Sequence, residues 1–532
     1  MKKLLALVLA LLMVFSMVAC GQKEEAPAAK EEETKTEAPK EEAKEETEAA
    51  ESASGRDDVN LTITSAFQST DAHGNRAVSE LVWRTQIYEP LFYMNEITLE
   101  YEPRLATEYS VSDDGLVYTF KLREDVKFHN GEPMKASDVV FSYEHIKNEK
   151  TWSTFYSNID YAEAIDDYTV AVHFLTKSAA AMNNVSQIWI ESEKEVTEQG
   201  EAFGTQACLA GTGAYYIEEF SENKVVLKAF DDYYRGEAPI ETVTYRTYAE
   251  ANAAVMALEA GEIDHYAVPA ANFPSFQAMD NFSNEVMAAN HITYACINYS
   301  ANDVLANDLV REAIAYAIDK EAMSIATFDG NAIPADYMEN PAYNVAAPEA
   351  DIVYNYNPEK AKELLAEAGY PNGVDIGAIC TSASNYFGDV AVVMQSNLAD
   401  VGITATLDVM ENSACIAALR AQEYDVGILG YSNTGDYDSF RQRVHSDNVG
   451  GYFVKFEGDK FDYQRFNDLF AEQLAELDLE KRMEITAELN DAVMETCCLL
   501  PLFYKPNLYV WNADLNVVNT PNFPEIYNWS WN

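Results

Sequence analysis

The alternation of hydrophobic and polar residues along most of the chain predicts short strands mixed with amphipathic helices. The stretches VNLTITSAF (59–67), AVHFL (171–175) and LPLFYKPNLYVW (500–511) are typical of strands. The stretch LVYTFKLREDVKFHNGEP (116–133) alternates on both sides of a polar Arg-Glu-Asp turn. It therefore predicts two strands joined at residues 123–125.

Helical periodicity is clearest in YNPEKAKELLAEAGYPNG (356–373). Asn357 is a favourable N-cap, Pro358 fits the first turn, and Gly369 provides a stop signal. A second helix is predicted to begin at Ser137, with its hydrophobic residues on one face.

Further helices are predicted to end at Gly261, to begin at Asp308, and to fill much of residues 463–496. Strands and helices alternate without a repeat period, so the body of the chain is expected to be α/β or α+β with mixed sheets.

The beginning of the chain has the pattern of a secretion signal. Lys2 and Lys3 precede a nearly unbroken hydrophobic run, residues 4–18. This run is shorter than the about 20 residues that span a bilayer, but it fits a signal peptide, here residues 1–19. Met17-Val18-Ala19-Cys20 resembles the lipobox of bacterial lipoproteins, which predicts lipidation of Cys20; an ordinary secreted protein is the alternative.

Residues 20–55 are expected to form a disordered acidic tether behind the lipidated cysteine. Residues 21–55 contain twelve Glu and five Lys, and they lack aromatic residues, Ile, Leu, Val and Phe. Such a segment cannot bury enough apolar surface to offset its ordering entropy. The prediction is a body held away from the outer face of the cytoplasmic membrane by a lipid anchor, or a periplasmic body if the cell has an outer membrane.

The formal net charge of −52 constrains the partners of the protein. A strongly acidic surface repels phosphate backbones, so no nucleic-acid partner is predicted. It attracts cationic or amine-bearing solutes, although the same charge also serves solubility alone.

Signatures of catalysis and of metal binding are absent from the sequence. The seven cysteines and seven histidines are dispersed, without CxxC or HExxH, and no GxSxG, Walker loop or GxGxxG occurs. Acidic residues are so abundant that no particular carboxylate pair indicates a glycosidase. We therefore predict no enzyme activity, no cofactor and no metal site.

Several motifs, in order along the chain, resemble those of extracellular solute-binding protein family 5, the peptide, dipeptide and nickel receptors of ABC importers. DVKFHNGEPMKASDVVFSYEHI (125–146) resembles the family signature. GTGAYYIEEF (211–220), ALEAGEIDH (257–265) and YNPEKAKELLAEAGY (356–370) resemble later family motifs, with Ala214 in place of a usual Pro.

The resemblance implies a two-lobed periplasmic-binding-protein-like α/β fold (type II, large peptide-binding class) with an extra subdomain inserted in the first lobe. The segments that it implies are 56–100, 206–294 and 501–532 for lobe I, 101–205 for the inserted subdomain, and 295–500 for lobe II.

The resemblance also implies a ligand site. Peptide binders of the family pair the ligand ammonium with an Asp of lobe II, and GILGYSNTGDYDSF (427–440) is the matching stretch. Asp436 is the expected partner, with Asp438 as the alternative, and Tyr431 replaces the usual Trp at a different spacing. Phe67 and Tyr156 are weaker candidates for ligand contact. A simple Asp- and Gly-rich turn is the structural alternative for 435–440.

These implications predict a monomer that captures di- or oligopeptides by hinge closure and delivers them to the transmembrane subunits of an ABC permease. Three other functions stay open: binding of nickel or a metal chelate, binding of an oligosaccharide, and hydrolysis at the cell surface. The sequence does not distinguish nutrient uptake from signalling.

Overall fold

The computed structural model describes residues 55–532 except 64, 349–350, 384–385, 433–434 and 447–462. The chain divides into two units, residues 1–51 and 52–532. The predicted signal peptide, Cys20 and nearly all of the predicted tether lie outside the described residues. Among the helices that the structure describes, none has both the length and the apolar character required to cross a bilayer.

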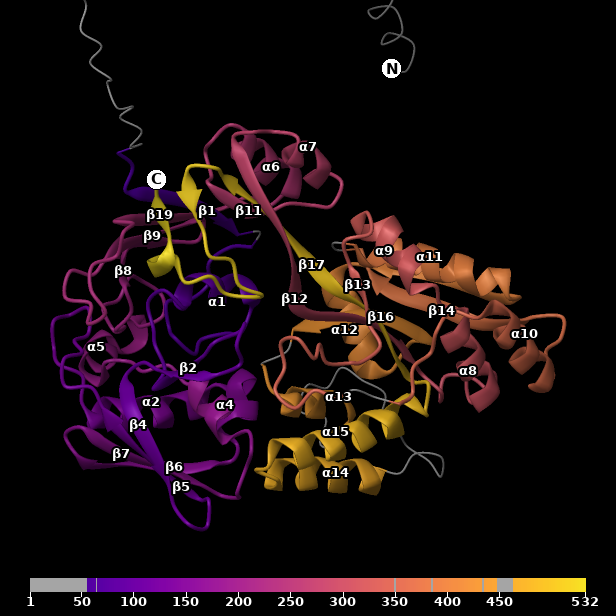
Figure 1. The fold of residues 1–532 in the computed structure, drawn as a ribbon, viewed down its shortest axis with the longest axis horizontal. Coiled ribbons are helices and arrows are strands. Elements are labelled where there is room, and N and C mark those ends of the chain that lie inside the picture. The colour runs from indigo at the N-terminus through magenta and orange to yellow at the C-terminus, as the bar shows by residue number, and fades with distance from the viewer. Residues whose placement is uncertain (1–54, 64, 349–350, 384–385, 433–434, 447–462) are drawn as a thin grey trace, which may run out of the picture. The chain divides into compact units, whose positions relative to one another are not determined.

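A large mixed sheet organises the described unit (Figure 1). Its strand order is β15 (Ile403–Met410), β14 (Val374–Ser382), β16 (Val426–Ser432), β12 (Phe282–Ile297), β17 (Leu499–Asn512), β11 (His265–Ala267), β1 (Asp58–Ile63), β10 (Thr242–Thr247), β9 (Lys224–Ala229) and β8 (Tyr215–Ser221), with β13 (Ile333–Pro334) paired to β17. Some neighbouring strands of this sheet are parallel, such as β1 with β10 and β14 with β15, and others are antiparallel, such as β10 with β9. This confirms the expected mixed sheet.

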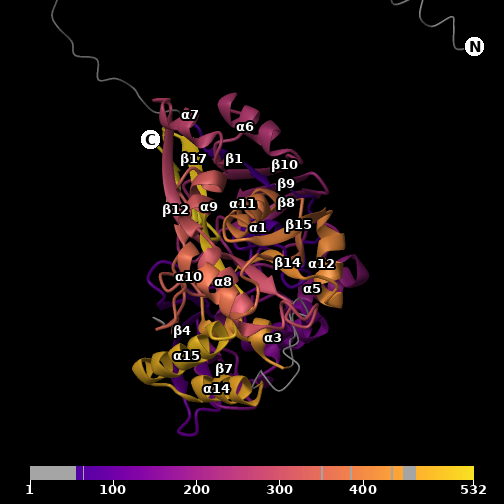
Figure 2. The same ribbon diagram turned by 90° about the vertical axis from the view of Figure 1, so that its right-hand side faces the viewer.

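The long strands β12 and β17 run antiparallel through the centre of this sheet (Figures 1 and 2). At one end β17 pairs with β11, and at the other end β12 pairs with β16. The register between β12 and β17 breaks between Ala288 and Ile292. The predicted lobe boundaries at 294/295 and 500/501 therefore fall inside two continuous strands.

A separate four-stranded sheet lies wholly within the predicted inserted subdomain, 101–205. Its order is β4 (Ala106–Val111), β5 (Val117–Leu122), β7 (Thr169–Phe174) and β6 (Ile159–Asp166). Two short pairs complete the described strands: β2 (Phe92–Met94) with β3 (Tyr101–Pro103), and β18 (Leu515–Asn516) with β19 (Ser530–Trp531). One hydrophobic core includes Phe120 of this sheet together with Trp83 and Tyr215 of predicted lobe I.

The helices of predicted lobe I and the inserted subdomain are α1 (Val78–Arg84), α2 (Ala136–His145), α3 (Ser153–Tyr156), α4 (Ala181–Ser186), α5 (Glu193–Gln199), α6 (Ala251–Glu259) and α7 (Phe273–Gln277). Those of predicted lobe II are α8 (Asp308–Ala317), α9 (Lys320–Phe328), α10 (Pro358–Glu367), α11 (Phe387–Asp400), α12 (Asn412–Ala421), α13 (Arg441–Val444), α14 (Tyr463–Ala475) and α15 (Leu479–Met494).

Most helix boundaries confirm the sequence predictions. The Asn357 side chain accepts the backbone N–H of Lys360 (3.0 Å), so it caps α10 as predicted. Gly261 follows α6 with φ +71°, a left-handed conformation that glycine adopts at little cost. The prediction that α2 begins with Ser137 as its cap was wrong, because the helix begins at Ala136. The Asp138 carboxylate accepts the N–H of the N-cap residue, Lys135 (2.9 Å).

The predicted second strand after residue 125 was also wrong. Residues 126–134 fold back on themselves: the Asn130 carboxamide accepts the N–H of Glu132 (3.0 Å), and Gly131 takes φ +84°. The N–H of Met134 donates to the carbonyl of Val126 (3.0 Å). Because this turn satisfies its own backbone, β5 pairs with β4 and β7 instead.

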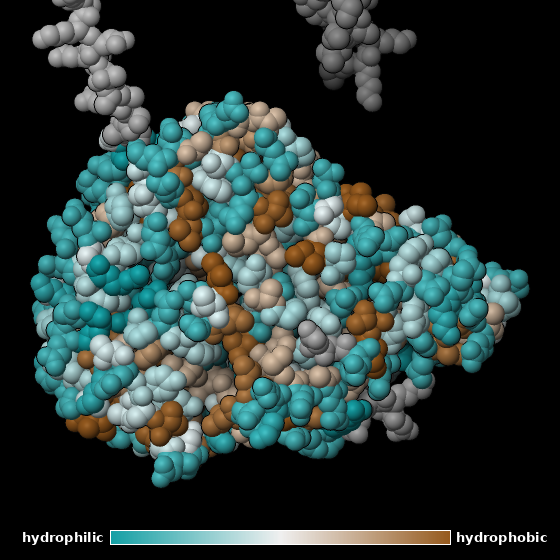
Figure 3. Space-filling view, viewed as in Figure 1, coloured by the Kyte–Doolittle hydropathy of each residue, from teal (hydrophilic) through white to brown (hydrophobic). Residues whose placement is uncertain are grey.

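Hydrophilic residues cover most of the face shown in Figure 3, as the acidic composition requires, and hydrophobic residues form a broken line down its middle. The 88 Asp and Glu outnumber the 36 Lys and Arg, so the few buried arginines identify places where charge is used structurally or functionally.

Candidate functional site

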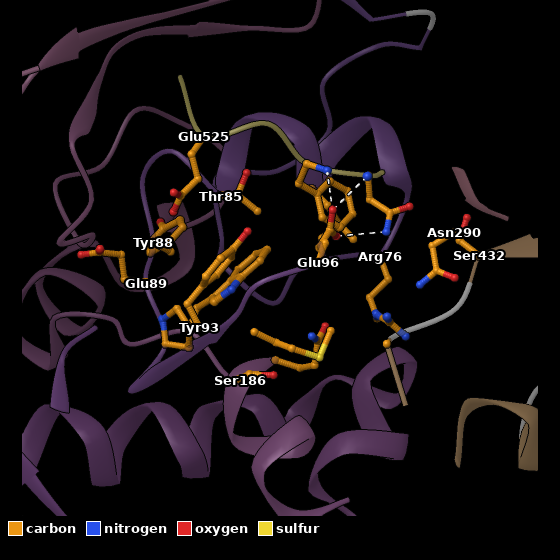
Figure 4. A pocket seen from close by; sticks show the side chains of 18 of the residues that line it. Arg76, Thr85, Tyr88, Glu89, Tyr93, Glu96, Ser186, Asn290, Ser432 and Glu525 are labelled. Carbon is orange, nitrogen blue, oxygen red and sulfur yellow. Dashed lines mark hydrogen bonds between the residues drawn. The ribbon is translucent and has the colours of Figure 1, made fainter. Parts of the chain in front are cut away.

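A cavity of about 510 Å³ lies among segments that are far apart in the sequence. Lobe I segments supply Arg76, Glu89, Glu96, Arg235 and Glu525; the inserted subdomain supplies Trp152 and Trp189; lobe II supplies Tyr343, Tyr431 and Arg443. Asn290 and His291 line the cavity from the register break of β12. Figure 4 shows ten of the lining side chains labelled, Arg76 and Asn290 among them.

The carboxylates at one side of the cavity are already hydrogen-bonded within the protein. Glu89 accepts from the hydroxyls of Tyr233 (2.9 Å) and Tyr234 (3.0 Å), and its burial raises its pKa. Glu525 lies 2.8 Å from an Arg104 guanidinium nitrogen and 3.8 Å from one of Arg235. These groups form a compensated network, in which each charge has a partner of the protein's own.

Glu96 is engaged in the same way. Its carboxylate accepts the backbone N–H and the carboxamide N–H of Asn522, both at 3.0 Å (dashed in Figure 4). Burial raises the pKa of Glu96. The contact fixes the C-terminal segment around Asn522 against the loop that follows β2.

Tyr431, predicted from the sequence, does line the cavity. Its hydroxyl lies 2.7 Å from a carboxylate oxygen of Glu339, and the Arg443 guanidinium lies over its ring, 4.2 Å from the centroid. Glu339 is fully buried, and burial raises its pKa to about 8. Tyr431 thus connects the cavity wall to a buried carboxyl group; its contact with a ligand stays a prediction.

Asp436 and Asp438 are not among the residues that line this cavity. The Asp436 carboxylate accepts two hydrogen bonds from the Arg482 guanidinium, at 2.8 and 2.6 Å, and both side chains are buried. The structure therefore gives Asp436 a guanidinium partner where the sequence predicts a ligand amine. This differs from the prediction because Arg482, on α15, is 46 positions away in the sequence, and local sequence patterns do not show contacts over that separation.

The alternative, Asp438, is also buried and lies 3.5 Å from the Nε of Arg441. Burial raises its pKa. In this arrangement Asp436 also caps the turn 437–440 by accepting the N–H of Asp438 (2.9 Å), which favours the structural interpretation of the Asp-rich stretch. A ligand-binding role of either carboxylate stays a prediction.

Phe67 and Tyr156 likewise do not line the cavity. Phe67 is 3% exposed and meets Trp83 edge to face at 6.0 Å. Tyr156 packs against the same hydrophobic core at the end of α3. The aromatic residue of this segment that does line the cavity is Trp152, four positions earlier.

A group that could hold a metal ion lies beside the cavity: Asp71, His73, His145 and Glu191, whose ligand atoms are within 4.8 Å of one another. The group is already connected by hydrogen bonds. His145 Nδ1 lies 2.7 Å from Glu191, which raises the pKa of His145 to about 9. His73 Nε2 accepts the backbone N–H of Trp189 (3.2 Å), so a neutral His73 carries its proton on Nδ1, the nitrogen that faces Glu191. We interpret the group as support for Trp152 and Trp189, whose rings pack on His73.

The protein-family comparison gives the context for this cavity. The family model described as bacterial extracellular solute-binding proteins, family 5 Middle, matches residues 100–451. The chain belongs to this family. The matched region includes all four motifs quoted above, between residues 125 and 370.

Individual relatives of this family 5 protein are also similar over most of the body. Oligopeptide-binding protein AppA of Bacillus subtilis is 27% identical over 358 residues, which cover 62% of this chain and 65% of AppA. Glutathione-binding protein GsiB of Shigella flexneri is 30% identical over 377 residues, covering 69% and 71%. NikA from Brucella suis, solved in complex with Fe(III)-EDTA, superposes with a TM-score of 0.80 at 21% identity, over 89% of this chain and 100% of NikA. The two-lobed binding-protein fold expected from the motifs is confirmed.

Sequence reasoning missed the arginines of this family 5 protein. Arg76 precedes α1 in HGNRAV, outside every motif, and Arg235 follows a pair of tyrosines. A scarcity of cations in an acidic chain is the available signal, but it does not say which arginine lies at the cavity.

Proposed function

We propose that this protein is the substrate-binding component of an ABC importer and captures short peptides in the 510 Å³ cavity. The observation that supports this function most is the cavity itself, which has the size of a small-molecule site and walls drawn from three distant segments. Family membership and the names of AppA and GsiB, which bind oligopeptide and glutathione, favour a peptide over other solutes.

Capture would occur by closure about β12 and β17. These two strands run through both halves of the large sheet, and the register break at residues 289–291 gives β12 a local site for bending. Asn290 and His291 lie in this break and line the cavity, so a ligand there would contact the bending point directly.

Export, anchoring and delivery belong to the same proposal. Cys20 would carry the lipid, residues 21–55 would act as the tether, and the body would present its ligand to the permease at the outer face of the cytoplasmic membrane. We propose that it acts as a monomer.

Binding of a metal chelate is the second candidate function. NikA, solved with Fe(III)-EDTA, shares the fold, and the arginines of the cavity could donate hydrogen bonds to the carboxylates of a chelator. The histidines lining the cavity are too few to supply a metal site by themselves in the described lining, where His291 is the one present.

Native mass spectrometry of the full chain, purified without denaturation and followed by denaturing release, tests the assignment. Adducts that resolve into short peptides would support a peptide receptor. Release of a chelate, a sugar or no ligand from protein that also fails to bind added peptides would contradict it and leave the fold unaffected.

A further inference from the structure

Arg76 differs in its surroundings from Arg104 and Arg235, the ion-paired arginines of the cavity. Arg104 and Arg235 both face Glu525. Among the described residues, no carboxylate lies within ion-pair distance of Arg76, and its Nε is buried without a hydrogen-bond acceptor. Arg76 is half-buried, and its Nε has lost water without gaining an acceptor, which is costly unless another molecule supplies one.

The Arg76 side chain is held in place by aromatic rings. Its guanidinium carbon lies 5.0 Å from the ring centroid of Trp152 and 4.5 Å from that of Phe155. Trp152 is in turn fixed edge to face by His73 at 5.2 Å and by Trp189 at 5.7 Å. Cation–π contact orients a guanidinium but does not use its N–H groups, which point outward in the plane of the guanidinium and can donate to a ligand.

Burial lowers the pKa of Arg76 to about 10, so the side chain is still a cation at neutral pH. The acidic side chains of the cavity do not neutralise it. Glu89 and Glu96 accept hydrogen bonds from Tyr233, Tyr234 and Asn522, and burial raises the pKa of both carboxyl groups. In Figure 4, Arg76 appears toward the Asn290 and Ser432 end of the view, whereas Glu89 and Glu525 appear at the other end.

Two further polar atoms of the cavity residues lack partners among the described residues. The indole Nε1 of Trp152 is a buried donor without an acceptor. The carboxamide oxygen of Asn290 is a buried acceptor without a donor, while its Nδ2 donates to the carbonyl of Tyr343 (3.1 Å). Two unmet donors, Arg76 and Trp152, and one unmet acceptor are complementary to a ligand that has an anionic group and an N–H.

We propose that Arg76 binds a carboxylate of the ligand, and that this contact makes the cavity selective for carboxylate-bearing ligands. The inference rests on the proposed function, which it extends by naming the ligand group. In a peptide, the carboxylate comes either from the C-terminus or from an Asp or Glu side chain, and both have the bidentate geometry that a guanidinium recognises.

The test uses the full chain, purified in mild detergent, and synthetic tripeptide pools of matched composition. One pair of pools has neutral side chains and differs only in a free or an amidated C-terminus. A second pair is amidated and differs only in one Glu or one Gln. Native mass spectrometry identifies the retained peptides, and calorimetric titration measures their affinities for wild type, Arg76→Gln, Arg76→Lys and the exposed control Arg246→Gln.

We expect wild type to bind the carboxylate-bearing member of at least one pair about 10- to 100-fold more tightly than its neutral match, as a charge-assisted hydrogen bond allows. Arg76→Gln should remove this preference, Arg76→Lys should retain part of it, and Arg246→Gln should leave it intact. Thermal denaturation establishes that each variant is folded. The pool pair that shows the preference identifies the source of the carboxylate.

Equal binding of neutral and carboxylate-bearing peptides by wild type would overturn the Arg76 inference alone, as would a preference that survives Arg76→Gln in folded protein. If wild type retains Fe(III)–EDTA but no peptide, and Arg76→Gln retains neither, the result would support the inference and overturn the peptide assignment. Retention of neither peptide nor chelate by wild type would overturn both.

Discussion

The Arg482 guanidinium and the Asp436 carboxylate form a bidentate ion pair, with nitrogen–oxygen distances of 2.8 and 2.6 Å, in a buried part of predicted lobe II. The pair joins α15 to the turn that follows β16. It shows how a conspicuous acidic residue near a binding site can be used by the fold itself.

Asp436→Asn should therefore lower the free energy of unfolding by more than it weakens the free energy of peptide binding. Removing one partner of a buried pair leaves an uncompensated charge and costs about 3–5 kcal/mol. Urea unfolding measures the loss, with exposed Asp113→Asn as the control. Stability at the wild-type level together with lost peptide binding would instead restore the ligand role that the sequence predicts for Asp436.

Glu339→Gln should change how stability depends on pH. Burial raises the Glu339 pKa to about 8, so between about pH 4.5 and 8 the folded protein binds a proton that the unfolded chain has released. The free energy of unfolding of wild type therefore falls across this window, by at most about 1.4 kcal/mol per pH unit from this group.

Urea unfolding at pH 5, 6.5 and 8 checks this prediction. The free energy of unfolding of Glu339→Gln should fall less steeply with rising pH than that of wild type. The exposed Glu108→Gln should follow wild type. Parallel slopes in wild type and Glu339→Gln would show that Glu339 does not titrate in this range.

His145 should titrate well above a free histidine, near pH 9, because Glu191 stabilises its protonated ring. The contribution of this pair to stability is fully present below about pH 6.5 and is lost as the pH rises through about 9. NMR titration of the histidine ring signals measures the pKa. Glu191→Gln should lower it, while the nearby exposed Glu193→Gln should not; a His145 pKa near 6.5 in wild type would refute the coupling.

Cys20→Ala should abolish lipid attachment and release the protein from the membrane. Labelling with a radioactive fatty acid and fractionation of cells measure both effects. Cys208→Ala changes a buried cysteine of the body and serves as the control. Membrane association that persists in Cys20→Ala would contradict the lipid anchor and leave the peptide-binding proposal unaffected.

The sequence by itself determined the local elements and the family. The cap at Asn357, the stop at Gly261 and the buried face of α8 follow from contacts within a few residues, which is why periodicity and capping patterns predict them. The family motifs are likewise short and contiguous, so they are readable without a structure.

Local patterns failed where a distant segment, or a tight turn, competes for the same groups. The stretch 126–134 satisfies its backbone within its own turn, and α2 takes its capping carboxylate from Asp138 inside the helix. In both places the observed structure and the predicted one fit the same sequence pattern, and only the three-dimensional arrangement distinguishes them.

The candidate site was decided by the tertiary structure. Asp436 acquires Arg482 from a helix 46 positions away, whereas Arg76 meets Trp152 and Phe155 and, within the part of the chain that the structure describes, no carboxylate. Whether a charge is available to a ligand depends on which groups the fold brings within a few ångströms, because Coulomb interaction and hydrogen bonding act at that range. The sequence specifies the types of these residues, and long-range packing decides which of them are already paired.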